Sequence, residues 1–157
     1  MHELVISPES FDSSGAQALL FAAIDELERR YGQIDDDAHL SNDELSSPRG
    51  LFLVARHQGH LAGGVGLRSI IEPNQQIGEI KRLWVRPDLR RCGVAAALMS
   101  DIEDRARLMG YRQLYLETGP AQPEAIAFYP KIGWTPTDRF PEGAFTHHGA
   151  TRFTKLL

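Results

Sequence analysis

The sequence predicts an α/β fold in which a mixed, mostly antiparallel sheet carries helices on both faces. Three strand-like segments follow one another through short turns, at residues 51–56, 61–71 and 77–85, and this succession indicates an antiparallel meander. A helical segment then separates the third strand from another at residues 112–118, which favours a right-handed parallel crossover. The length of 157 residues favours one domain, spanning residues 1–157.

The first third of the chain is predicted to hold a short strand, a long helix and a polar loop. Residues 2–7 form the expected strand, which Pro8 ends. Gly32 can end the helix, whose start is capped by one of Asp12, Ser13 and Ser14. The polar residues that follow, up to residue 50, are expected to form a loop. The helical spacing itself is carried by Leu20, Ile24, Leu27 and Tyr31, with Ala16 and Ala23 beside them.

The second half of the chain is predicted to alternate helices with strands. Gly110 stands where a C-terminal glycine cap belongs, and Pro123 favours the start of a helix over residues 123–132. Residues 134–137 and 150–157 are the expected final strands. The apolar last strand offers a sheet edge for pairing, which leaves a homodimer open. The helix before Gly110 has one apolar face, made of Val94, Leu98, Ile102, Ala106 and Met109.

Composition argues against several classes of function. The formal net charge of −4 disfavours general nucleic-acid binding, which needs clustered Lys and Arg. No apolar run approaches the roughly 20 residues of a membrane helix, and residues 1–10 do not resemble a signal peptide. Cys92 is the one cysteine, so no intramolecular disulfide can form, which fits a reducing compartment. We therefore expect a cytoplasmic protein that binds neither nucleic acid nor membrane.

The junction between the third strand and the following helix, "RRCGVAAALM" at residues 90–99, indicates a phosphate site. A helix N-terminus exposes unpaired N–H groups and a positive dipole end, so anions bind there readily. Small residues such as Gly93 and Ala95 let a ligand approach the backbone, and Arg90 and Arg91 bring positive charge. A simple helix start with two exposed arginines is the competing interpretation. Neither a dinucleotide-binding G-x-G-x-x-G motif nor a G-x-x-x-x-G-K-[ST] phosphate loop matches.

Three stretches together resemble the GCN5-related N-acetyltransferase (GNAT) family. They are residues 78–99, with the pattern R-x-x-G-x-A at Arg90, Gly93 and Ala95; the strand "LYLETG" at residues 114–119; and "AIAFYPKIGW" at residues 125–134. The order of the elements extends the resemblance over nearly the whole chain. Ala95 replaces the second glycine of the family pattern, and Cys92 stands where many relatives carry glycine or another polar residue.

The resemblance implies acetyl-CoA as the co-substrate. In the family, backbone amides of the loop hold the pyrophosphate, and the pantetheine pairs with the preceding strand as an added strand would. Gln122 lies where relatives often carry an asparagine that touches the cofactor. The cofactor-binding residues implied in this chain are Leu83, Trp84, Val85, Arg90, Arg91, Cys92, Gly93, Val94, Ala95, Ala96 and Gln122.

Acetyl transfer to an amine needs a proton acceptor, an oxyanion donor and a proton donor for the thiolate. Tyr129 is the candidate acid, because the family commonly places this tyrosine near the cofactor sulfur. Glu79 and Glu117 both compete for the role of base, and transfer through a water relay stays open. The alternative is that Tyr129 only packs on the sheet and that the glutamates only form salt bridges, for example with Lys81 or Arg82.

Three cations on the central strands are candidates for binding the acceptor: Arg68, Lys81 and Arg82. Each could bind a carboxylate, arginine in a bidentate way. Neighbouring residues of a strand face opposite sides, so Lys81 and Arg82 are not expected to share a pocket. His147 and His148 could line the acceptor pocket or lie in a plain surface loop. No metal site is expected, and the acidic run at residues 35–37 is interpreted as solvated.

These features predict an N-acetyltransferase that moves acetyl from acetyl-CoA to a small-molecule amine, such as an amino acid or a related carboxylate-bearing amine. Two alternatives remain open at this stage. One is a protein acetyltransferase that acts on an N-terminus or a lysine, and the other is a non-catalytic acyl-CoA-binding module. The family resemblance does not name the acceptor.

Overall fold

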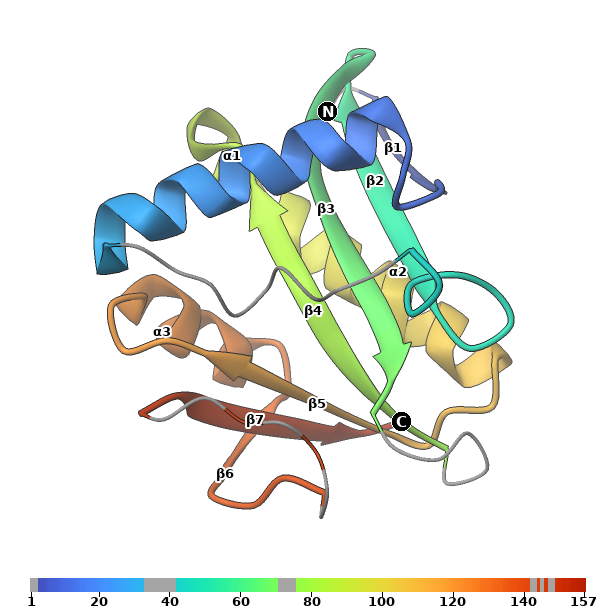
Figure 1. Ribbon diagram of the computed structural model, residues 1–157, viewed down its shortest axis with the longest axis vertical. Helices are drawn as coiled ribbons and strands as arrows, with labels where there is room; N and C mark the ends of the chain where they lie inside the picture. Colours follow the sequence, from blue (N-terminus) through green and yellow to red (C-terminus); the bar gives the residue numbers. More distant parts are fainter. Residues whose placement is uncertain (1–2, 33–41, 71–75, 142–143, 145, 147–148) are drawn as a thin grey trace.

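The computed structural model describes residues 3–32, 42–70, 76–141, 144, 146 and 149–157. The helices are α1 (Ser14–Tyr31), α2 (Val94–Leu108) and α3 (Pro123–Lys131), with a short 3-10 turn, η3, at Pro87–Leu89. The strands are β1 (Leu4–Pro8), β2 (Leu51–His57), β3 (His60–Ser69), β4 (Ile77–Val85), β5 (Gln113–Thr118), β6 (Thr135–Thr137) and β7 (Thr151–Leu156). The strands form one 7-stranded sheet in the order β1-β2-β3-β4-β5-β7-β6 (Figure 1).

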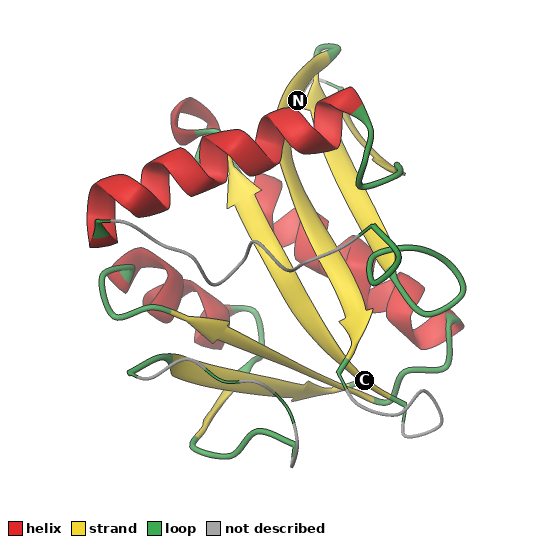
Figure 2. Cartoon of the chain, in the orientation of Figure 1, coloured by secondary structure: helices red, strands yellow, loops and turns green. Residues whose placement is uncertain are grey.

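The predicted mixed sheet with helices on both faces is confirmed. Only the pair β4 and β5 is parallel, and α2 connects these two strands; all other neighbouring strands are antiparallel. Figure 2 shows α1 in front of the central strands and α2 behind them. We call the two sides of the sheet the α1 face and the α2 face. A cluster of buried apolar residues lies on each, so both helices cover a hydrophobic layer.

Helix α1 turns small residues toward the sheet, which differs from the apolar face expected from its sequence. Ala16, Leu19 and Ala23 are buried, whereas Tyr31 is 37% exposed. The reason is the surface of β3. A Cβ added at Gly64 would lie only 3.0 Å from the Leu19 side chain, so the helix sits close to the strand. Larger side chains along that stripe would hold α1 away from the sheet. Leu20, Ile24 and Leu27, the residues of the expected face, are half-buried at its side.

The last strand is not a sheet edge, contrary to expectation. β7 lies between β5, which pairs with it along its whole length, and β6, which pairs with Arg152–Thr154. The edge on this side is the three-residue strand β6, which contains Pro136. Chain order could not show this, because β6 precedes β7 in the sequence yet lies outside it in the sheet. The edge expected at residues 150–157 is therefore covered by β6 within the chain at Arg152–Thr154.

Candidate active site

The turn between β4 and α2 presents an open helix N-terminus. Gly93 is the N-cap residue, with φ 88°, and no side chain caps the helix. Arg91 also has a positive φ, of 64°, so the loop bends sharply twice before the helix begins. A Cβ added at Gly93 would meet no atom within 4 Å, and Arg91, Cys92 and Ala96 are exposed. The first N–H groups of α2 thus point into open space, which suits a phosphate group.

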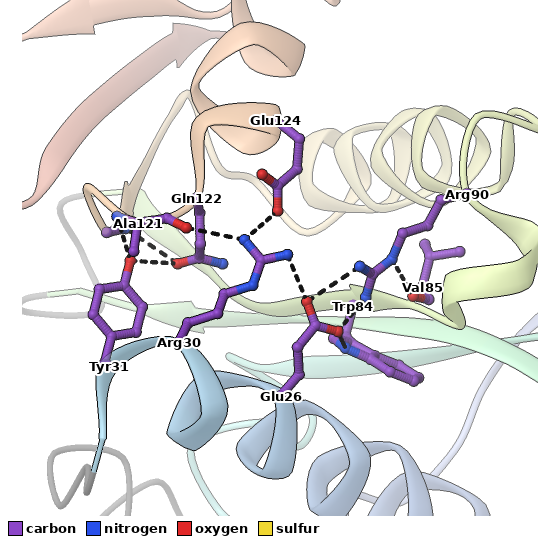
Figure 3. Close-up of polar contacts among 10 residues, drawn as sticks. Glu26, Arg30, Tyr31, Trp84, Val85, Arg90, Ala121, Gln122 and Glu124 are labelled. Carbon is purple, nitrogen blue, oxygen red and sulfur yellow. Dashed lines mark hydrogen bonds and ion pairs between the residues drawn. The ribbon is translucent and has the colours of Figure 1, made fainter.

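The guanidinium of Arg90 points back into the protein. It donates hydrogen bonds to the Glu26 carboxylate at 2.5 and 3.1 Å and to the Val85 carbonyl at 2.8 Å. It also lies over the Trp84 ring, 5.7 Å from the centroid (Figure 3). Arg90 therefore ties the start of the loop to both β4 and α1.

Strands β4 and β5 separate soon after they begin. Their ladder covers only Ile77–Glu79 of β4 and Gln113–Tyr115 of β5, and Figure 1 shows the strands diverging from there. The three residues expected to pair with the pantetheine, at positions 83–85, fall on the diverging part of β4. Leu83 packs against the core of the α2 face and Trp84 against that of the α1 face. The β5-facing backbone of this segment lies beyond the ladder, as an added extended ligand requires.

A β-bulge in β4 corrects the expected orientation of two cations. Gly64 pairs with Trp84 but Gly66 pairs with Lys81, so β4 holds one extra residue, and Arg82 there has a φ of 62°. A bulge interrupts the alternation of side chains along a strand. Lys81 lies opposite Gly66 on the α1 face, and Arg82 lines a small apolar cavity there with Phe52 and other residues under α1. The argument that Lys81 and Arg82 must face opposite sides is therefore wrong.

Glu79 is the most deeply buried carboxylate of the site. Its side chain is 2% exposed and accepts hydrogen bonds from Arg68 at 2.9 and 3.1 Å, while Lys81 Nζ lies 4.0 Å away. Burial raises the pKa of Glu79 above its ordinary value, although Lys81 and Arg68 oppose the rise; the charge of Glu117 adds to it. A raised pKa brings this carboxyl group closer to the range useful for a base.

Glu117 occupies a similar place on β5. It lies opposite Arg152 of β7, which donates a hydrogen bond to it at 3.0 Å. Arg152 also lies over the ring of Phe140, which packs edge-on against Tyr115 at 5.2 Å. The structure therefore brings two carboxylate–arginine pairs to the α1 face on either side of the point where β4 and β5 diverge. The sequence reasoning missed Arg152, Phe140 and Tyr115, although Arg152 stands beside Phe153 in the last strand, where a charge was a possible signal.

Tyr129 lies on the other side of the sheet. Its ring is 7% exposed and packs near Trp134 and Phe153, at centroid distances of 6.2 and 5.4 Å. Burial raises its pKa, so the phenol is protonated at neutral pH. The described part of the chain offers its hydroxyl no hydrogen-bond partner. α3 runs through Pro130 and ends at Lys131, followed by Gly133 with φ 94°. The expected helix end is confirmed.

Gln122 is the N-cap residue of α3, without a side-chain cap hydrogen bond, and it contacts the end of α1. Its Oε1 accepts from the Gly119 N–H at 3.3 Å and from the Tyr31 hydroxyl at 3.4 Å. The Tyr31 hydroxyl accepts in turn from the Ala121 N–H at 2.9 Å (Figure 3). The predicted cofactor contact thus lies next to Glu26, Arg30 and Tyr31 of α1. The sequence singled out only Tyr31 of these, and only as part of the helical spacing. The charged pair Glu26 and Arg30, four residues apart on one helix, was the available signal.

Some expectations fall outside the described residues, namely those for His147, His148 and the acidic run at residues 35–37. Within the residues that are described, no three His, Cys, Asp or Glu side chains gather as metal ligands would. The same part of the chain has no helix with the length and apolar character that crossing a bilayer requires.

Comparison with known proteins agrees with this geometry. The acetyltransferase (GNAT) family model matches residues 8–134. The IAA acetyltransferase of Azospirillum brasilense is 35% identical over 135 residues, covering 84% of this chain and 86% of that protein. An acetyltransferase structure from Streptococcus agalactiae aligns over 100% of both chains with a TM-score of 0.80 and 17% identity. The PaiA N-acetyltransferase of Thermoplasma acidophilum, in complex with coenzyme A, aligns over 99% of both chains with a TM-score of 0.75 and 19% identity.

The matched region includes β4, the loop at residues 90–93 and α2, which form the open helix N-terminus. Proteins of this family use acetyl-CoA as the acetyl donor, and the start of α2 at Gly93 is open and made of small residues. The chain belongs to the GCN5-related N-acetyltransferase family, and it is an acetyl-CoA-dependent N-acetyltransferase.

Proposed function

We propose that this enzyme acetylates the amine of a small molecule that also carries a carboxylate, such as an amino acid. The observation that carries this proposal is the pairing on the α1 face, where Glu79 is bonded to Arg68 and Glu117 to Arg152. Carboxylates attract an ammonium group, and arginine binds a carboxylate in a bidentate way. Both kinds of partner stand beside the segment of β4 that would hold the acetyl donor. Lys81 and Arg82 add positive charge to the same face.

Acetyl-CoA would bind along the diverging part of β4 and across the start of α2. The pyrophosphate would lie against the backbone N–H groups from Arg91 to Ala96, including Cys92, Val94 and Ala95. The pantetheine would extend beside Leu83, Trp84 and Val85, toward Gln122 on the β5 side. Arg90 would contribute by holding the loop, since its guanidinium is engaged by Glu26 and the Val85 carbonyl. The small residues of the loop support this placement, because the ligand can reach the backbone.

The acid and the base would act from opposite faces of the sheet. Glu79 lies on the α1 face and Tyr129 packs among the residues of the α2 face. The amine nitrogen attacks the thioester carbonyl carbon, a C–N bond forms and the C–S bond breaks. Glu79, directly or through a water molecule, accepts one ammonium proton before the attack, and Tyr129 donates a proton to the leaving thiolate. The second proton, which the nitrogen loses as the amide forms, returns through water to Tyr129 and restores the phenol. Glu117 remains the alternative base and otherwise helps to attract the ammonium. Backbone N–H groups of β4 would bind the oxyanion.

The experiment that tests the proposal is a thiol-release assay with acetyl-CoA and a panel of acceptors. The panel pairs each amino acid with its carboxamide or decarboxylated analogue, and adds polyamines, aminoglycosides and peptides. We expect turnover with amino acids and at least a tenfold lower kcat/KM for the matched analogue without a carboxylate, because the arginine that binds the acceptor would lose a charge-assisted contact. Equal rates for both members of each pair would refute the carboxylate requirement.

The same panel separates the two alternatives. Turnover confined to peptides would identify a protein acetyltransferase. Tight binding of acetyl-CoA in calorimetry, with no turnover on any acceptor, would contradict the small-molecule proposal and favour a non-catalytic role. The Arg152→Gln and Arg68→Gln variants then show which arginine binds the acceptor carboxylate. Only replacement of that arginine should raise the KM of the acceptor, and the affinity for acetyl-CoA should stay unchanged.

A further inference from the structure

The two segments that flank the proposed cofactor site have no ladder between their far ends. We call residues 80–93 the β4 arm and residues 116–124 the β5 arm. The last ladder pair between the strands is Glu79 with Tyr115, so both arms lie beyond it. Something other than sheet pairing must therefore set the distance between them, and that distance decides whether an extended ligand fits.

The C-terminal part of α1 contacts the β4 arm through Glu26. Its carboxylate accepts hydrogen bonds from Arg90, at 2.5 and 3.1 Å, and from Trp84 Nε1 at 3.1 Å. The Glu26 side chain is 15% exposed. The Arg90 guanidinium holds the pKa of Glu26 below its usual range, together with Trp84 and Arg30 and against partial burial, so the carboxylate is ionised at neutral pH. Hydrogen bonds between ionised partners, such as those between Arg90 and Glu26, are stronger than bonds between neutral groups.

The next turn of the same helix contacts the β5 arm. Arg30 forms an ion pair with Glu26 at 3.0 Å and another with Glu124 of α3 at 2.5 Å. It also donates a hydrogen bond to the Ala121 carbonyl at 3.0 Å. Tyr31 adds its hydroxyl bonds to the same loop, and a Cβ at Gly119 would lie 2.0 Å from that hydroxyl, so the ring end rests directly on the β5 arm. Figure 3 shows the chain of contacts from Arg90 through Glu26 and Arg30 to Glu124.

We propose that Glu26, Arg30 and Tyr31 form a clasp that fixes the separation of the two arms and so holds the acetyl-CoA site in its binding shape. These are positioning residues: they act through Arg90 and through the loop at Gln122. The inference rests on the proposed cofactor site. It adds that α1, an element with no residue in the phosphate loop or in the acid and base pair, determines cofactor affinity.

The Glu26→Gln variant distinguishes the clasp from a purely electrostatic role of Arg90, because the two predict opposite changes in cofactor affinity. If Arg90 served mainly as positive charge for the phosphates, Glu26→Gln would release its guanidinium and remove a nearby negative charge, and acetyl-CoA would bind more tightly. If Glu26 holds the arms, the same variant weakens binding. Calorimetry with coenzyme A distinguishes the two by the sign of the change, and tighter binding would overturn the clasp.

The chain supplies matched controls on the same helix. Arg29 and Asp25 form an i, i+4 ion pair like Arg30 and Glu26, but their side chains are 67% and 66% exposed. We expect Arg30→Gln to weaken coenzyme A binding about 5- to 20-fold, the lower part of the usual range for coupling between a site and its support. Arg29→Gln should stay within about twofold, because an exposed pair contributes little. Equal dissociation constants for the two variants would overturn the proposal.

Arm spacing can be measured without any ligand. Cys92 is exposed on the β4 arm and is the one cysteine of the chain, so a spin label can be placed there and a second at Ala127→Cys, an exposed position of α3. Double electron–electron resonance should give a narrow distance distribution for the otherwise unchanged protein and for Arg29→Gln. Arg30→Gln should broaden it or move its maximum. An unchanged distribution would refute the clasp, whereas failure of the unchanged protein to bind coenzyme A would refute the proposed cofactor site.

Discussion

Alanine substitutions of two glycines at opposite ends of α2 separate an effect on folding stability from an effect on cofactor affinity. Gly93, at the N-cap, has a φ of 88°, and Gly110, just beyond the C-terminus, has a φ of 95°. A Cβ added at either position would meet no atom within 4 Å. Alanine at each site therefore causes backbone strain and no clash. We expect about 1–2 kcal/mol of destabilisation for each variant, which corresponds to a Tm lower by roughly 2–8 °C for a chain of this length.

Of the two variants, only Gly93→Ala should weaken the binding of coenzyme A. Its methyl group would stand at the open start of α2 and hold the pyrophosphate away from the first N–H groups. Loss of one hydrogen bond to a charged group costs about 1.5–3 kcal/mol, or roughly 10- to 150-fold in the dissociation constant. Gly110→Ala lies at the far end of the helix and should bind coenzyme A as tightly as the unchanged protein.

The assay combines thermal unfolding with calorimetric titration of coenzyme A at a temperature where both variants are folded. Similar Tm values with a large difference in affinity would confirm the reasoning. If both variants bound coenzyme A equally well, the phosphate would not lie at Gly93, and the placement of the cofactor across the start of α2 would be wrong.

Three further predictions concern the catalytic pair and the core. The base must be ionised, and burial raises the pKa of Glu79. We therefore expect kcat/KM to fall as pH drops through a value above the ordinary carboxyl range. Glu79→Gln should remove this acidic limb of the pH profile, and an acidic limb that persists in the variant would favour Glu117 as the base. Tyr129→Phe keeps the ring packing and should lower kcat by about 10²-fold with coenzyme A affinity unchanged in calorimetry; an unchanged kcat would exclude Tyr129 as the acid. Leu98→Ala, at a fully buried site facing the sheet, should cost about 2–5 kcal/mol in denaturant unfolding, and a loss below 1 kcal/mol would contradict the packing of α2.

The acid stability of the protein should also depend on the clasp. The folded-state pKa of Glu26 is lowered, so its contribution is fully present above the ordinary carboxyl pKa and is lost as pH falls through the lowered value. Glu26→Gln should therefore reduce the free energy of unfolding more at neutral pH than in strong acid. Chemical unfolding at several pH values measures this difference, and equal losses at neutral pH and in strong acid would refute it.

The order of the elements and the open helix start at Gly93 were predictable from sequence because each depends on local properties of the chain. Helix and strand periods, the glycine at position 93 and the glycine at position 110 act within a few residues of themselves. The strands and helices lie close to where their patterns placed them, and α1 ends at Tyr31, followed by Gly32, as expected. The family resemblance came from the same local stretches.

Tertiary structure alone decided which charged groups meet. Arg90 turns to Glu26, which is 64 residues away in the chain, and Glu117 pairs with Arg152 across β5 and β7. The bulge at Arg82 brings two neighbouring cations to one face, and β7 inserts inside the sheet. None of these follows from a local period, because each depends on how distant strands align and how closely α1 approaches them. The sequence by itself determined the order of the elements and the glycine-containing turn before α2, because both depend on local properties of the chain. The packing of α1 and the alignment of the strands decided which side chains surround that turn.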